Sequence, residues 1–248
     1  MMSIYQTEEI VARLKSLENP ANVAGMARYG INPQNTLGIS IYTLRKIARE
    51  IGNDHALAED LWKTGIHEAR ILSSYIDRPE WVTEEQMERW VSDFDSWDVC
   101  DQVCDLFDKT PFAYAKAIEW SGRSEEFVKR AGFTMVAGLA VHDKKAGDEK
   151  LAQFFPIFIR ESVDDRNFVK KAVNWALRNI GKRNQNLNRM AIETAQTILQ
   201  ADNRTARWIA RDALRELTSE KIGKKLKRCA TLSETAIEAR NKLNHESE

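Results

Sequence analysis

Trp97 and Asp101, which lie four residues apart, are the pair whose residue types and spacing are best suited to catalysis. On a helix this spacing places both side chains on one face. A carboxylate beside an indole can stabilise a developing cation or orient a water molecule. The same pattern is also typical of an acidic helix face with a packed tryptophan, so the two residues alone leave both interpretations open.

Asp101 is part of an acidic run in which carboxylates recur every three or four residues, at Asp95, Asp98, Asp101, Asp105 and Asp108. Like charges at this spacing on a helix repel each other by about 0.2–0.5 kcal/mol per pair. We therefore expect Asp95, Asp105 and Asp108 to point away from Asp101, into hydrogen bonds between helices.

Other reactive motifs have little support in the sequence. Cys100 and Cys104 match no common zinc spacing and have no histidine close by, so we expect no metal site. There is no phosphate-binding loop and no Gly-rich dinucleotide motif, so we expect no cofactor. A histidine-based triad is not indicated, because the four histidines are scattered: His55, His67, His142 and His245.

The net charge of zero hides an imbalance. Residues 1–124 carry 13 basic and 20 acidic side chains, net −7, whereas residues 125–248 carry 24 and 17, net +7. Such asymmetry between halves points to a nucleic acid or another anionic partner.

Basic stripes lie on three segments of the second half. One consists of Lys171, Trp175, Arg178 and Lys182; the next of Arg204, Arg207, Arg211 and Arg215, with Trp208 beside it; and Arg130 begins a third. If the three stripes lie side by side, they would line a groove that binds phosphates through its positive charge. The indoles between the cations would stack on bases or pack on sugars. The alternative is a set of solvated outer faces with Trp175 in the core.

Helices must position these residues, because helical periodicity of apolar residues runs through almost the whole chain. Thr83 and Gln86 form a capping-box pattern, and Gly52 stands where a helix is expected to end. Gly and Pro are few, 11 and 5 residues, and no hairpin pattern is present, so a sheet is not expected.

The helices also repeat. Arg130, Lys171 and Arg211 occupy similar motifs and are separated by 41 and 40 residues. A period near 40 residues with paired helices is typical of HEAT-like arrays, which stack into a curved solenoid with a concave surface. We predict an all-α HEAT-like repeat solenoid, an α-α superhelix, as a single domain over residues 1–232, followed by a polar C-terminal helix or tail at residues 233–248.

These residues in this order resemble the AlkD-type DNA alkylation repair family, alkylpurine DNA glycosylases built from HEAT-like repeats. The resemblance runs from about Met26 to about Leu226 and is carried by Trp97–Asp101, Lys129–Ala131 and Lys171–Arg178. One departure is Ser96, where family members can carry a second tryptophan before Trp97.

The resemblance implies roles for individual residues. Asp101 matches the catalytic carboxylate, and Trp97 and Trp175 match two indoles that pack against the deoxyribose of the damaged nucleotide. The concave groove is implied to bind DNA. The expected DNA-binding residues, from the resemblance and the basic stripes, are Arg130, Tyr29, Lys171, Arg178, Lys182, Arg207 and Arg211.

The implied activity is hydrolysis of the N-glycosidic bond of N3- or N7-alkylated purines in duplex DNA, a step of base excision repair. Alkylation makes the base a cationic leaving group, so one Asp that stabilises the oxocarbenium-like sugar and positions water would suffice. The alternatives are a non-catalytic HEAT-repeat protein that binds DNA or RNA structures, and a protein-binding scaffold.

We expect a cytoplasmic monomer. No apolar run approaches the roughly 18–20 residues of a membrane helix, and the first residues lack an apolar signal segment. The odd number of cysteines, 3, fits reduced thiols.

Overall fold

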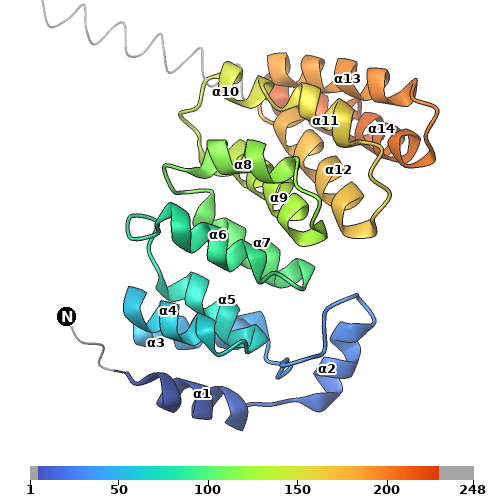
Figure 1. Cartoon of the computed structure of the whole chain (residues 1–248). Coiled ribbons are helices and arrows are strands. Elements are labelled where there is room, and N and C mark those ends of the chain that lie inside the picture. The colour runs from blue at the N-terminus through green and yellow to red at the C-terminus, as the bar shows by residue number, and fades with distance from the viewer. Residues whose placement is uncertain (1–4, 229–248) are drawn as a thin grey trace, which may run out of the picture. The chain divides into compact units, whose positions relative to one another are not determined.

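The computed structural model of the chain describes residues 5–228, and every regular element in that range is an α-helix (Figure 1). The helices are α1 (Thr7–Ser16), α2 (Pro20–Ala27), α3 (Ile41–Ile51), α4 (His55–Lys63), α5 (His67–Ile76), α6 (Glu84–Ser92), α7 (Trp97–Phe107), α8 (Ala113–Ser121), α9 (Glu126–His142), α10 (Asp148–Ala152), α11 (Phe155–Glu161), α12 (Asn167–Gly181), α13 (Gln185–Leu199) and α14 (Arg204–Leu217), and residues 220–228 are helical as well. The prediction of an all-α protein is confirmed.

None of these helices combines the length and the apolar character that crossing a membrane requires.

The chain divides into two compact units, residues 1–139 and 140–248. The sequence predicts one repeat domain over residues 1–232, and this remains a prediction. The predicted polar tail at residues 233–248 lies outside the described residues.

In the first unit, α5 packs against α4, α3 and α7. The apolar stripes of these helices supply a core of fully buried side chains such as Leu44, Leu61 and Val103. Full burial of one such side chain favours folding by about 1.5–3 kcal/mol. Aromatic rings extend this core, with Trp62 stacked on Trp90 at 4.1 Å between ring centroids.

Helix ends in this unit follow the local sequence. Thr83 caps α6 by accepting a hydrogen bond from the Gln86 backbone N–H, as predicted. The Gln86 side chain, however, donates to the Asp77 carboxylate at the end of α5 at 2.7 Å. This buried contact replaces the second hydrogen bond of a capping box, which would join the Gln86 side chain to the Thr83 backbone N–H. Gly52 ends α3 with a φ of 79°, a conformation that favours glycine.

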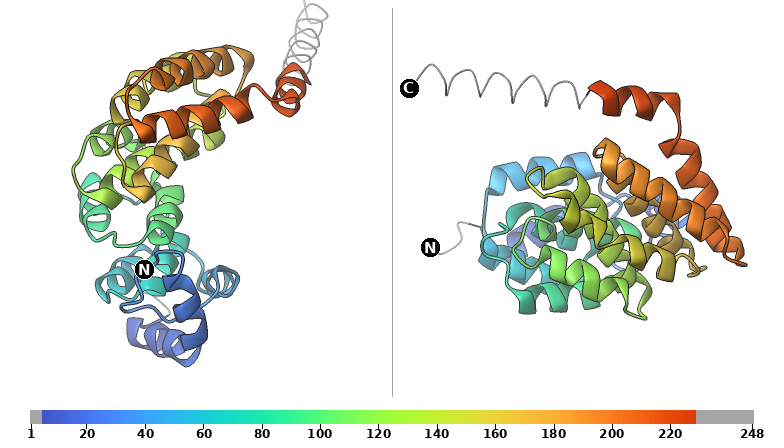
Figure 2. Two further views of the ribbon diagram at one scale, coloured as in Figure 1. Left: turned by 90° about the vertical axis from the view of Figure 1, so that its right-hand side faces the viewer. Right: turned by 90° about the horizontal axis from the view of Figure 1, so that it is seen from above.

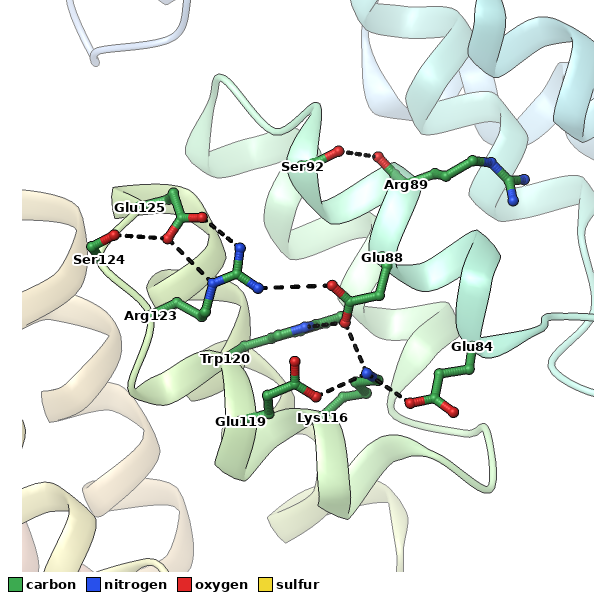
Figure 3. Close-up of polar contacts among 10 residues, drawn as sticks. All are labelled: Glu84, Glu88, Arg89, Ser92, Lys116, Glu119, Trp120, Arg123, Ser124 and Glu125. Atoms are coloured by element: carbon green, nitrogen blue, oxygen red, sulfur yellow. Dashed lines mark hydrogen bonds and ion pairs between the residues drawn. The ribbon is translucent and has the colours of Figure 1, made fainter.

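Helices α6 and α8 are joined by a charged cluster around Lys116 (Figure 3). The Lys116 ammonium lies 2.8 Å from carboxylate oxygens of Glu84, Glu88 and Glu119, and Glu88 also accepts from the Trp120 indole N–H. The Lys116 side chain is only 5% exposed. Its three acidic partners therefore compensate the burial of its charge.

Helices α8 and α9 approach closely at Gly132. A Cβ atom at this position would lie 2.5 Å from the Ser121 backbone nitrogen. The absence of a side chain thus sets the spacing of the two helices and fixes the start of α9, where Arg130 lies.

In the second unit, α12, α13 and α14 pack against one another (Figures 1 and 2). The apolar pattern predicts a helix pair over residues 187–199 and 206–217; α13 and α14 end at the predicted residues and begin two residues earlier. The same pattern predicts one helix over residues 151–160, but these residues are divided between α10 and α11. Pro156 lies in the first turn of α11, where its missing N–H costs no hydrogen bond.

Candidate functional site

Asp101 of α7 and Arg130 of α9 form an ion pair with two hydrogen bonds. Arg130 Nε donates to Asp101 Oδ1 at 3.0 Å, and Arg130 Nη2 donates to Oδ2 at 2.8 Å. Thr134, one turn after Arg130, donates its hydroxyl to Oδ1 at 3.2 Å. The side chains of Asp101 and Arg130 are 19% and 8% exposed. The carboxylate is therefore held in a fixed orientation, with a small part of its surface open.

The electrostatics of this pair reflect its burial. Burial raises the pKa of the Asp101 carboxyl, while the charge and hydrogen bonds of Arg130 and Thr134 oppose that rise. Burial also works against the charged Arg130, but Asp101 outweighs it and raises the pKa of the guanidinium. Each group compensates the other, so removal of either one leaves a buried charge without its partner.

Trp97, the first residue of α7, lies next to this pair. The Arg130 guanidinium carbon is 6.0 Å from the centroid of the Trp97 ring, a cation–π distance. The Trp97 indole N–H donates to the Tyr29 backbone oxygen at 3.1 Å. Tyr29 itself is 76% exposed. The first unit thus brings together four of the residues expected from the sequence: Trp97, Asp101, Arg130 and Tyr29.

The segment that follows Tyr29 is anchored to the start of α7. The Asn32 backbone N–H donates to the Ser96 hydroxyl, and its side chain donates to Asp95, both at 2.8 Å. Further along, the buried Glu68 carboxylate accepts backbone N–H groups of residues 37–39. Trp97 and Tyr29 are therefore held together although they are far apart in sequence.

Other aspartates of the acidic run make contacts away from Asp101, as expected for Asp105 and Asp108. Asp98 pairs with His67 of α5 at 2.9 Å, and Asp105 pairs with Lys109 at 3.2 Å. Asp108 is buried against α9, where a Cβ atom on Gly138 would meet its carboxylate.

In the second unit, the polar face of α12 carries the predicted stripe. Lys171 is exposed, and Trp175 is partly exposed instead of lying in the core. Arg178 and Lys182 pair with Glu216 of α14, at 2.6 and 3.2 Å. Two of the expected DNA-binding cations are thus partly neutralised by an acid of the next helix.

The basic stripe of α14 lines a cavity of about 400 Å³. Arg207 pairs with Asp202 at 3.1 Å, whereas Arg211 is exposed. The residues around this cavity are Arg204, Arg207, Trp208, Arg211, Asp212 and Arg215.

Sequence reasoning missed several residues of these surfaces. Thr134 could have been found from its place one turn after Arg130. Glu216 gave no signal, because its role depends on how α14 packs against α12. Also missed was a cavity of about 410 Å³ on α3 and α5 that includes Arg45, Arg49 and Tyr75.

Comparisons with known proteins agree with this architecture. A family model described as DNA alkylation repair enzyme matches residues 10–217. A solved structure described as belonging to "a new family of proteins related to the HEAT-like repeat DNA glycosylases with affinity for branched DNA structures" superimposes with a TM-score of 0.71, at 19% identity, and the match covers 86% of this chain and 95% of that one. The HEAT-like repeat fold is thereby confirmed.

Other solved structures are more distant. A designed armadillo repeat protein in complex with the peptide (KR)4 gives a TM-score of 0.38 at 16% identity, covering 77% of this chain and 81% of that one. No curated protein matches the sequence.

Proposed function

Since the chain belongs to the DNA alkylation repair enzyme family, we propose that it is a DNA glycosylase that releases cationic N3- or N7-alkylated purines from duplex DNA. The proposal is supported above all by the Asp101 carboxylate, which Arg130 and Thr134 orient beside Trp97.

In this mechanism the alkylated base leaves as a neutral molecule, taking the electron pair of the glycosidic bond. The deoxyribose is left as an oxocarbenium-like cation. The open part of the Asp101 carboxylate stabilises this cation and positions a water molecule, which attacks C1′ and gives its proton to this carboxylate. Trp97 packs against the sugar, so the base itself need not be gripped, and the family resemblance implies the same role for Trp175.

Arg130 has two proposed roles. It fixes the carboxylate through the ion pair, and it contacts a phosphate near the damaged nucleotide when DNA is bound. Further phosphates are bound by the cations of α12 and α14, where Lys171 and Arg211 are exposed and Arg178 and Lys182 exchange Glu216 for phosphate. Tyr29 and Arg207 complete the proposed DNA-binding set.

A second candidate is a protein that binds DNA structures without catalysis. It is favoured by the commitment of both Asp101 oxygens to Arg130, since this leaves the carboxylate less available to a sugar. The structural relative with a TM-score of 0.71 is described as having affinity for branched DNA.

A base-release assay on methylated duplex DNA separates the two candidates. The wild-type chain should release methylated purines, and Asp101→Asn should lower the rate by about 100-fold or more while duplex affinity changes little. The matched control is Asp105→Asn on the same helix, whose carboxylate is 57% exposed and paired with Lys109. A wild-type protein that binds DNA but releases no base would favour the second candidate.

A further inference from the structure

Trp208 on α14 exposes a large aromatic surface in a strongly cationic setting. Its relative exposure is 42%, and it lines the cavity of about 400 Å³ together with four arginines. A cavity of this volume falls within the range of small-ligand sites. The cavity therefore combines a flat ring for stacking with charges for anions.

The charges around Trp208 are mostly available to a ligand. Lys170 of α12 lies 5.8 Å from the ring centroid and adds a fifth cation. Asp212 is the one acid that lines the cavity, and its carboxylate accepts from Arg215 and from Asn174. Within residues 5–228, Arg204 and Arg211 have no acidic partner.

This combination fits a nucleotide whose base is not already stacked. Phosphates of a duplex need only cations, because the faces of paired bases are covered by their neighbours. An unpaired base offers a free face, and stacking on an aromatic side chain favours binding whatever the base.

We propose that Trp208 stacks on an unpaired base of DNA, while Arg204 and Arg211 bind the flanking phosphates. The preferred ligand is then DNA with a single-stranded segment, such as a fork with unpaired arms, and not a plain duplex. The proposal rests on the DNA binding proposed above but not on base release.

The test measures binding of the full-length chain to a blunt duplex and to a fork of the same paired sequence that carries unpaired arms. Trp208→Ala should weaken fork binding by roughly 5- to 100-fold and leave duplex binding nearly unchanged. Trp208→Phe should retain most of the fork affinity, because a ring remains for stacking. Since Trp208 is half exposed, the variants should stay folded, and circular dichroism checks this.

Trp81→Ala is the matched control. Trp81 is 41% exposed and has Arg78 at 5.3 Å from its ring, so it presents a similar indole in a different unit. It should leave fork binding unchanged.

Three outcomes would overturn the proposal. These are an unchanged fork affinity in Trp208→Ala, an equal loss on fork and duplex, and an equal loss in Trp81→Ala. A wild-type chain that binds neither DNA would instead contradict the proposed function and this inference with it.

Discussion

Asp101 and Arg130 lie 29 residues apart in sequence and meet in a two-point ion pair that joins α7 to α9, at 3.0 and 2.8 Å. The carboxylate proposed for catalysis is therefore also a structural link between two helices. Its chemistry and the stability of the first unit depend on the same contact.

The coupling of these two residues can be measured. Arg130→Ala leaves the buried Asp101 carboxylate without its cation, so the free energy of unfolding should fall by about 2–4 kcal/mol. Asp101→Ala should have a similar effect, and the double variant should cost clearly less than the sum. Urea unfolding of the four proteins gives the coupling free energy, and strictly additive effects would show that the pair is not energetically linked.

Trp175→Ala should reduce base release more than it reduces stability. The ring is partly exposed on α12, so its removal should cost less than about 2 kcal/mol of unfolding free energy. The reference is Trp90→Ala, whose ring is 1% exposed and should cost about 3–5 kcal/mol. If Trp175→Ala destabilises as much as Trp90→Ala, the ring belongs to the core and its role at the sugar loses support.

Stability should fall with rising pH through His67. Burial opposes the charged ring, but the hydrogen bond and charge of Asp98 outweigh it and raise the pKa of His67. A pKa that is higher in the folded state means that the contribution is fully present below about pH 6.5, the unfolded value, and is lost as the pH rises through the folded value.

The measurement is the unfolding free energy from pH 5 to 9 for the wild type and for His67→Gln. The difference between the two proteins should shrink as the pH rises above about 6.5. A difference independent of pH would exclude a charged His67 as the source of the stabilisation.

Glu216→Gln should strengthen duplex binding. The variant removes the carboxylate that pairs with Lys182 and the nearer of the two that pair with Arg178, which keeps Asp212 at 3.7 Å, so both cations can turn toward phosphate. The plot of log affinity against log salt should steepen by up to about 0.9 for each additional phosphate that the protein neutralises. Glu193→Gln is the control, because this acid is 57% exposed and pairs with Arg189 of its own helix. Weaker binding in Glu216→Gln would show that the pairs hold the cations in their productive positions.

Gly132→Ala should destabilise the first unit, because the added methyl group meets the backbone of α8 at 2.5 Å. It should also displace Arg130 and thereby slow base release. Gly25→Ala on α2 is the matched control, since nothing lies within 4 Å of its added carbon and alanine favours a helix by about 0.5–1 kcal/mol. Equal stability of the two variants would mean that α8 can move aside without cost.

Much of the fold follows from local sequence. Helices α13 and α14 are long, strongly periodic and capped by Asn184 and Asn203, so pattern and capping agree on their bounds. The four-residue spacing of Trp97 and Asp101 also places them on one helix, as the structure shows.

The pairing of side chains could not be predicted in the same way. Nothing in the spacing tells that Asp101 faces Arg130, that Asp98 faces His67 or that Glu216 faces Arg178. These contacts depend on the packing of helices that are about 30 to 40 residues apart in sequence. A repeat period indicates which helices are neighbours but not which side chains meet.

The pairs along the acidic run change the field that an approaching phosphate would meet. Asp101 and Asp105 each have a cationic partner within 3.2 Å, in Arg130 and Lys109, and Asp98 lies 2.9 Å from His67, whose pKa it raises. Each such pair acts as a dipole, and the potential of a dipole falls with the square of distance, faster than that of a single charge. A DNA strand near Trp97 therefore meets far less repulsion than a run of five aspartates suggests, and the carboxylate of Asp101 acts only at contact range.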